Sequence, residues 1–235
     1  MVTTLLTFAR CTGFVFRAPG LSHPSVPAPL RAGFAAILTM VILSAPHPTV
    51  HVANAAATLV ALGTEFLLGS AIGMTASLIY DAAYAGGRVV DDYVGMRAIA
   101  PNLQLVAPSG FGRVWSLAFT GGFFLSGAYR LALLDFAQSF TRIPIGCNLH
   151  AGGLGTYASG FAATFAVVAL QIAAPALGLA FVAQIGIGAL SRAVPRFGSF
   201  TLAFPLAFAA AIVATAIAVP VVTARVPAPL ALRLP

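Results

Sequence analysis

The chain has 235 residues, of which 60% are hydrophobic and only 7% are charged, and its formal net charge is +7. A soluble domain carries roughly a quarter charged residues, so this chain has too few to cover its own surface in water. The composition therefore excludes a soluble globular protein and predicts an integral membrane protein.

Side chains suited to catalysis are scarce. All twelve basic residues are arginine, which excludes P-loop, Schiff-base and Ser–Lys chemistry. Glu65 is the sole glutamate, which excludes a His-Glu-x-x-His zinc helix. His47 and His51 lie one turn apart, but the prolines at 46 and 48 argue against a helical metal site there. The sequence therefore predicts no catalytic, cofactor-binding or metal site.

The arginines are spread over many connections and form no basic stripe with interleaved aromatic residues. This distribution argues against nucleic-acid binding. It is better explained by membrane orientation and by contacts with anionic membrane lipids.

Apolar stretches at about 1–16, 32–45, 53–80, 114–134, 157–190 and 199–224 predict one polytopic helical membrane domain over 1–224. A spanning helix needs ~20 apolar residues, so the first two stretches are short. The fifth is too long for one straight span. Pro175 and Gly178 near its middle favour a kinked segment or two shorter helices packed as a hairpin. The Pro-rich tail at 225–235 is predicted to be frayed or extended.

The third stretch contains Glu65, and an ionisable side chain at membrane depth is costly unless it is partnered or protonated. Two interpretations are open. One is a proton or ion site; the other is an interhelical hydrogen bond or an ion pair with an arginine such as Arg10 or Arg130. In the same stretch, Gly69 and Gly73 form a small-xxx-small step that predicts close packing of another helix.

After the third stretch, Arg88, Asp91 and Asp92 fall at positions i, i+3 and i+4 and share one helix face. This pattern is typical of a solvated helix end with a local ion pair. A docking surface for soluble partners is the alternative.

The connection 95–113 is rich in Pro and Gly and more hydrophobic than a solvated loop. Non-helical backbone at membrane depth is tolerated where it is buried in protein or lines a cavity. The segment is therefore either an ordinary surface loop or a pore plug. The candidate plug residues are Ile99, Pro101, Leu103, Leu105, Val106, Pro108, Gly110 and Phe111.

Residues 184–208 predict a reversal between two apolar segments. Pro195 lacks a backbone N–H and Gly198 has little backbone restraint, so one helix ends here and another begins. Arg192 and Arg196 predict that the turn lies at a membrane surface.

Four passages, in this order, resemble the FliR family of flagellar biosynthetic membrane proteins. They are Glu65-Phe-Leu-Leu-Gly69 with Gly73, Gln138-Ser-Phe-Thr-Arg-Ile-Pro-Ile-Gly146, Gly188-Ala-Leu-Ser-Arg-Ala-Val-Pro195 and Leu202-Ala-Phe-Pro-Leu206. The family elbow residues are Gly188, Arg192, Pro195, Phe204 and Pro205. The chain departs from the family pattern at Val194, Ala203 and Ala207, and it carries Arg88 and Asp91-Asp92 where the family has a Glu and a Gln-Met-Gly pattern.

The resemblance implies an all-α integral membrane protein whose helical hairpins form one subunit of a helical export gate. The implied partners are FliP-like and FliQ-like membrane subunits, the large export-gate protein and exported flagellar proteins. The implied location is the bacterial inner membrane at the flagellar basal body, and the segment at about 99–112 would plug the pore. The injectisome counterpart is one alternative. A small ion-coupled transporter that uses Glu65 is the other.

Overall fold

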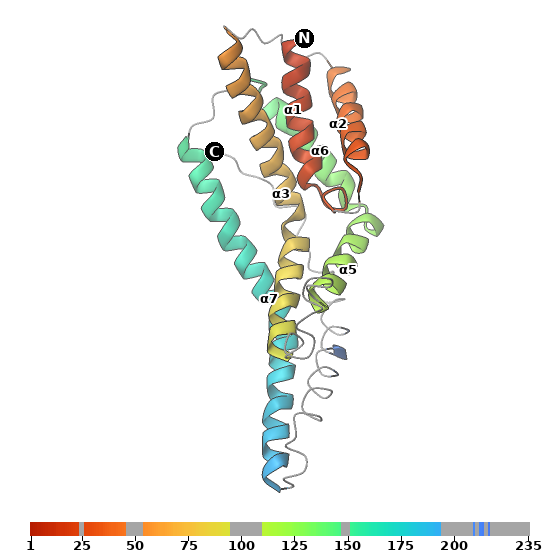
Figure 1. Ribbon diagram of the computed structural model, residues 1–235, viewed down its shortest axis with the longest axis vertical. Helices are drawn as coiled ribbons and strands as arrows, with labels where there is room; N and C mark the ends of the chain where they lie inside the picture. Colours follow the sequence, from red (N-terminus) through yellow and green to blue (C-terminus); the bar gives the residue numbers. More distant parts are fainter. Residues whose placement is uncertain are drawn as a thin grey trace. The chain divides into compact units, whose positions relative to one another are not determined.

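The computed structural model describes residues 1–23, 26–45, 54–94, 110–146 and 151–193, together with the single positions 209, 212, 213 and 216 (Figure 1). The described part of the chain is helical and contains no strand. Its helices are α1 (Val2–Arg17), α2 (Ala28–Leu43), α3 (Ala55–Val94), α5 (Phe111–Leu125), α6 (Ala128–Arg142) and α7 (Ala151–Ala193). The all-α prediction is confirmed.

Local chemistry explains where several helices begin and end. Ala18 precedes a proline and has extended backbone (φ −62°, ψ 141°), so α1 ends before it. Asn54 caps α3, because its side-chain oxygen accepts a hydrogen bond of 2.8 Å from the N–H of Ala57. Ile143 also precedes a proline and is extended, which ends α6.

The apolar stretch at 114–134 is not one continuous helix. The helical conformation is interrupted by a turn at residues 126 and 127, and the axes of α5 and α6 differ by 77° across it. Gly127 has a φ of +76°, a left-handed conformation that glycine adopts without steric cost. The predicted single stretch is therefore corrected to two helices.

The long stretch at 157–190, in contrast, is not divided into two helices. It belongs to one helix of 43 residues, α7, which continues through Pro175. Of the two alternatives for this stretch, the hairpin of two shorter helices is therefore wrong, and the kinked segment stays a prediction. Like the 40-residue α3, this helix exceeds the ~20 residues that a span requires.

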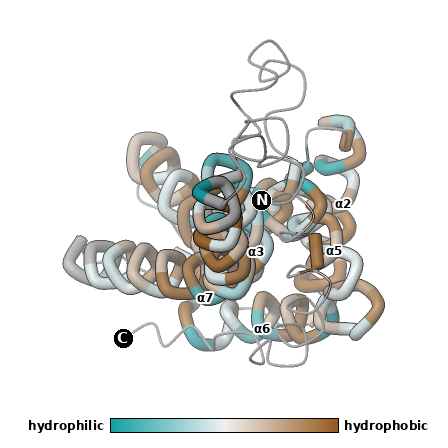
Figure 2. The backbone as a smooth tube through the Cα atoms, turned by 90° about the horizontal axis from the view of Figure 1, so that it is seen from below, coloured by the Kyte–Doolittle hydropathy of each residue, from teal (hydrophilic) through white to brown (hydrophobic). Residues whose placement is uncertain are grey.

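Among the described residues, two helices, Ala55–Tyr93 and Thr156–Ala189, are long and apolar enough to cross a membrane, and the bent α5–α6 pair would make a third if it forms one span. Hydrophobic residues (brown in Figure 2) lie along these helices, and many of their side chains are exposed. Such surfaces belong in lipid or against other apolar helices rather than in water. The chain is a membrane protein.

The chain forms two compact units. Of the described residues, the first unit comprises those within Met1–Leu78 and Phe123–Phe161, and the second comprises those within Ile79–Gly122 and Ala162–Val226. Helices α3, α5 and α7 each contribute residues to both units. The single membrane domain over 1–224 and the extended tail at 225–235 stay predictions.

The first unit contains a hydrophobic core. Helices α1 and α2 pack against each other (Figure 1). Phe14 of α1 stacks on Phe136 of α6 with 4.2 Å between ring centroids, and Phe140 meets Phe136 edge-on at 5.4 Å. Ile72 of α3 belongs to the same buried cluster. The first unit therefore joins α1, α2, the first part of α3 and α6 around one apolar centre.

Candidate functional site

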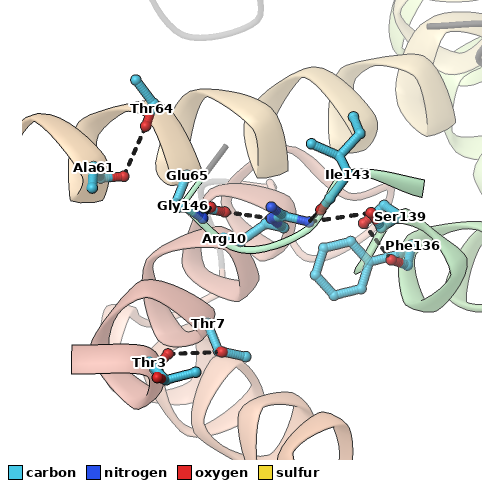
Figure 3. Close-up of polar contacts among 10 residues, drawn as sticks. All are labelled: Thr3, Thr7, Arg10, Ala61, Thr64, Glu65, Phe136, Ser139, Ile143 and Gly146. Atoms are coloured by element: carbon cyan, nitrogen blue, oxygen red, sulfur yellow. Dashed lines mark hydrogen bonds and ion pairs between the residues drawn. The ribbon is translucent and has the colours of Figure 1, made fainter. Parts of the chain in front are cut away.

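A charged pair lies inside the first unit. Arg10 of α1 and Glu65 of α3 expose only 0% and 1% of their surfaces. The Nε of Arg10 donates a hydrogen bond of 2.5 Å to Oε2 of Glu65 (Figure 3). Burying either charge alone would be strongly unfavourable, so each side chain requires the other. Of the two arginines that the sequence offered as partners of Glu65, the structure selects Arg10.

The same arginine binds the C-terminal end of α6. Its Nη1 donates to the carbonyl oxygens of Ser139 at 3.3 Å and Ile143 at 2.9 Å. Carbonyls in the last turn of a helix lack partners within the helix, and the helix dipole favours a cation there. The guanidinium carbon also lies 4.5 Å from the ring centroid of Phe140. Arg10 therefore ties α1 to both α3 and α6.

Glu65 completes the arrangement through its second oxygen. Oε1 accepts a hydrogen bond of 2.8 Å from the N–H of Gly146. Gly146 has a φ of +82°, a left-handed conformation that glycine adopts without steric cost, and it lies beside Glu65 (Figure 3). We call Arg10, Glu65, Ser139, Ile143 and Gly146 the Arg10–Glu65 cluster. It joins two passages that the sequence singled out separately, around Glu65 and around Ile143-Pro-Ile-Gly146.

Glycines bring α1 and α3 together beside this cluster. A Cβ atom added to Gly69 would overlap the carbonyl oxygen of Arg10, and one added to Gly73 would lie 2.7 Å from the carbonyl oxygen of Phe14. On the facing helix, a Cβ on Gly13 would overlap the carbonyl oxygen of Phe66. The two backbones are therefore in direct contact, which is the geometry that small-xxx-small steps allow. Ala9 and Gly13 form a small-xxx-small step in α1 that the sequence analysis did not single out.

The first residues of α7 are also attached to α3. The hydroxyl of Tyr157 lies 2.7 Å from the carbonyl oxygen of Ala71, to which it donates, and 2.8 Å from the hydroxyl of Thr75. Both α3 residues lie in the turns that follow Gly69. The part of α3 from Glu65 to Thr75 thus makes polar contacts with α1, with the turn that follows α6 and with the start of α7.

We expect Gly146→Ala to destabilise the first unit by about 1–3 kcal/mol, because a residue with a Cβ is strained at this φ. The strain competes with the hydrogen bond to Glu65. Thermal denaturation of the purified full-length chain in detergent measures the loss. Gly160→Ala is the control, because that helical glycine has open space around it. Equal stability of the two variants would contradict the prediction.

The structure changes the interpretation of the acidic group on α3. Asp92 is exposed, as a solvated helix end requires, but Asp91 is buried and accepts a 2.9 Å hydrogen bond from the N–H of Phe111. The interpretation of Asp91 as part of a solvated face is therefore wrong. Spacing along one helix cannot show that a second helix covers the same face.

The remaining predicted residues are only partly described. Phe111 begins α5, so the connection predicted over 95–113 ends at Gly110. Gly188 and Arg192 lie in α7, which runs to Ala193, beyond the predicted end of the stretch at 190. Outside the described residues lie the candidate plug positions Ile99, Pro101, Leu103, Leu105, Val106 and Pro108, and the elbow positions Pro195, Phe204 and Pro205.

The contacts of the cluster join separate helices to one another. Glu65 is its single acid, and both oxygens of that carboxylate accept hydrogen bonds. Across the described ranges, no three His, Cys, Asp or Glu side chains gather in a way that would hold a metal ion. The arrangement is that of a structural clamp.

The chain was compared with known proteins. The family model described as "Bacterial export proteins, family 1" matches residues 1–228. Flagellar biosynthetic protein FliR of Aquifex aeolicus is 25% identical over 229 residues, which cover 95% of this chain and 87% of the relative. FliR of Bacillus subtilis is 26% identical over 209 residues (86% of this chain, 80% of the relative). FliR of Caulobacter vibrioides is 26% identical over 215 residues (86% and 82%).

The family match extends over both compact units and includes every residue of the Arg10–Glu65 cluster. It also agrees with the order of the four passages that carry the resemblance in the sequence. The chain therefore belongs to the bacterial export proteins, family 1, the family of the flagellar biosynthetic protein FliR.

Proposed function

We propose that this chain is a structural, non-enzymatic subunit of the flagellar type III protein export gate. It forms part of the pore through which unfolded flagellar subunits are secreted. Its proposed place is the flagellar basal body, as a multi-pass protein of the bacterial inner membrane. The proposed partners are FliP-like and FliQ-like membrane subunits, the large export-gate protein, the exported flagellar proteins and membrane lipids.

The observation that carries this proposal is the full-length match. The family model covers residues 1–228, and each of the three relatives above is matched over at least 80% of its length. All three are named as flagellar proteins, which favours the flagellar branch over the injectisome.

The surface of the helices supports assembly with other membrane components. Large apolar side chains on α2 and α7 keep more than half of their surface exposed. Faces of this kind are suited to lipid and to neighbouring apolar helices. They include Ile37, Met40 and Val41 on α2, and Phe181, Val182 and Ile185 on α7.

The proposal is tested by expressing a tagged copy in a flagellated bacterium that lacks its own FliR. We expect the chain to restore motility and to purify with two other small membrane proteins of the export gate. The competing function, an ion-coupled transporter, predicts that the purified chain alone moves a solute in liposomes and that Glu65→Gln abolishes this transport. That result would overturn the gate proposal.

Within the gate, we propose that the connection before α5 plugs the pore. Its apolar, Pro- and Gly-rich composition supports this position, and Phe111 is now assigned to the helix that follows. We expect deletion of 102–109 to leave assembly intact and to make cells permeable to small solutes. Unchanged permeability in cells with a fully assembled complex would count against the plug.

A further inference from the structure

Asp91 of α3, in the second unit, is a buried carboxylate that the Arg10–Glu65 cluster does not involve. Only 3% of its surface is exposed, whereas the adjacent Asp92 is exposed. A carboxylate removed from water is unfavourable unless it accepts hydrogen bonds or meets positive charge. The atoms that contact Asp91 therefore indicate its role.

Two of those atoms belong to the first turn of α5. The N–H of Phe111 donates to Oδ1 of Asp91 at 2.9 Å, and the N–H of Gly112 lies 3.5 Å from Oδ2. The carbonyl of Gly110 accepts from the N–H of Val114 at 3.1 Å, so Gly110 occupies the N-cap position. A glycine has no side chain to bind the first N–H groups of the helix. Asp91 supplies that acceptor from another helix, and its negative charge is favourable at a helix N-terminus.

A second, independent contact holds the same two helices together. Gly87 lies one turn before Asp91, and a Cβ atom on Gly87 would overlap the backbone of Gly112. Next to this contact, Trp115 exposes only 1% of its surface and meets Phe111 edge-on, with 6.4 Å between ring centroids. The end of α3 and the start of α5 are thus joined by backbone contact, by a charged cap and by a buried indole.

We propose that Asp91 is a positioning residue that holds the start of α5 against the end of α3. The connection between Val94 and Gly110 leaves and re-enters the described structure within a few residues of this contact. Asp91 therefore joins the two described helix ends that flank the connection proposed as the plug. This inference rests on the proposed function of the chain as a gate subunit, and it adds the residue that positions the pore-closing segment.

The contact itself is tested with the only tryptophan of the chain, Trp115. In the purified full-length chain, we expect Asp91→Ala to shift tryptophan emission to longer wavelength and to increase quenching by acrylamide, because the start of α5 separates from α3. Asp91→Asn keeps the size and one acceptor oxygen, so we expect a smaller shift. Asp92→Asn is the matched control and leaves emission unchanged. Emission of Asp91→Ala equal to that of the unaltered chain would overturn the proposal.

Its effect on the gate is measured in cells by permeability to a small solute, together with co-purification of the partner subunits. We expect complexes carrying Asp91→Ala to assemble and to leak, whereas complexes carrying Asp92→Asn stay sealed. If Asp91→Ala does not assemble, Asp91→Asn is used for the permeability measurement. Assembled but sealed complexes would overturn the positioning role. Failure of the proposed function is recognised separately, because the unaltered chain would then neither restore motility nor purify with gate subunits.

Discussion

Glu65→Leu is expected to destabilise the first unit by about 3–5 kcal/mol, because it leaves the buried guanidinium of Arg10 without its counter-charge. The N–H of Gly146 loses its acceptor in the same variant. We expect a large fall in the denaturation temperature of the purified full-length chain and a low yield of folded protein. Thermal denaturation in detergent measures the first effect, and the monodisperse fraction measures the second.

Two controls separate the buried pair from ion pairs in general. The ion pair of Asp135 with Arg142 spans 3.2 Å and is partly exposed to the surroundings. Asp135→Asn should therefore cost no more than ~1 kcal/mol. The double variant Arg10→Met with Glu65→Leu removes both charges, so it should be more stable than the sum of the two single losses implies. Additive losses would show that the two side chains are not coupled.

Gly69→Ala is expected to cost roughly 1–3 kcal/mol, because the added Cβ would overlap the backbone of α1 at Arg10. Backbone atoms cannot relieve the overlap by a change of rotamer, as a side chain can. Helix α1 must therefore move away from α3. That movement also lengthens the contact between Arg10 and Glu65. The loss of stability is measured by thermal denaturation of the same purified chain.

Gly63→Ala on the same helix is the matched control. That glycine has open space around it, and alanine favours a helix interior over glycine by roughly 0.5–1 kcal/mol. We therefore expect Gly63→Ala to be neutral or stabilising. If both variants have the same stability, close contact between α1 and α3 does not contribute to the fold.

Composition was sufficient to predict a membrane protein, because 7% charged residues are too few to cover the surface of a soluble domain. Hydrophobic stretches also located most helices, since apolar side chains must be continuous where a helix meets lipid or a core. The boundaries were less accurate. The break at Gly127 depends on backbone conformation, to which hydropathy is insensitive. The hairpin expected in the fifth stretch relied on Pro175 ending a helix, whereas α7 continues through that residue.

The polar site was only half predictable. Sequence alone identified Glu65 as a residue in need of a partner, because a lone carboxylate among apolar residues is unfavourable wherever the chain folds. It could not choose between Arg10 and Arg130, which lie 55 and 65 residues away along the chain. Only the tertiary structure decided that choice, and only it brought the carbonyl of Ile143 and the N–H of Gly146 to the pair.

The partners of Asp91 could not be predicted from the sequence either. Its spacing with Arg88 is compatible with a local ion pair on an exposed face, and local spacing is all that a single helix reveals. The structure instead places the amide groups of the next helix against its carboxylate. Sequence by itself therefore determined the class of the protein and the residues that require partners, because these follow from the solvation of each side chain. Tertiary structure decided which partners they have, because backbone N–H and carbonyl groups are the same at every position and become specific only through packing.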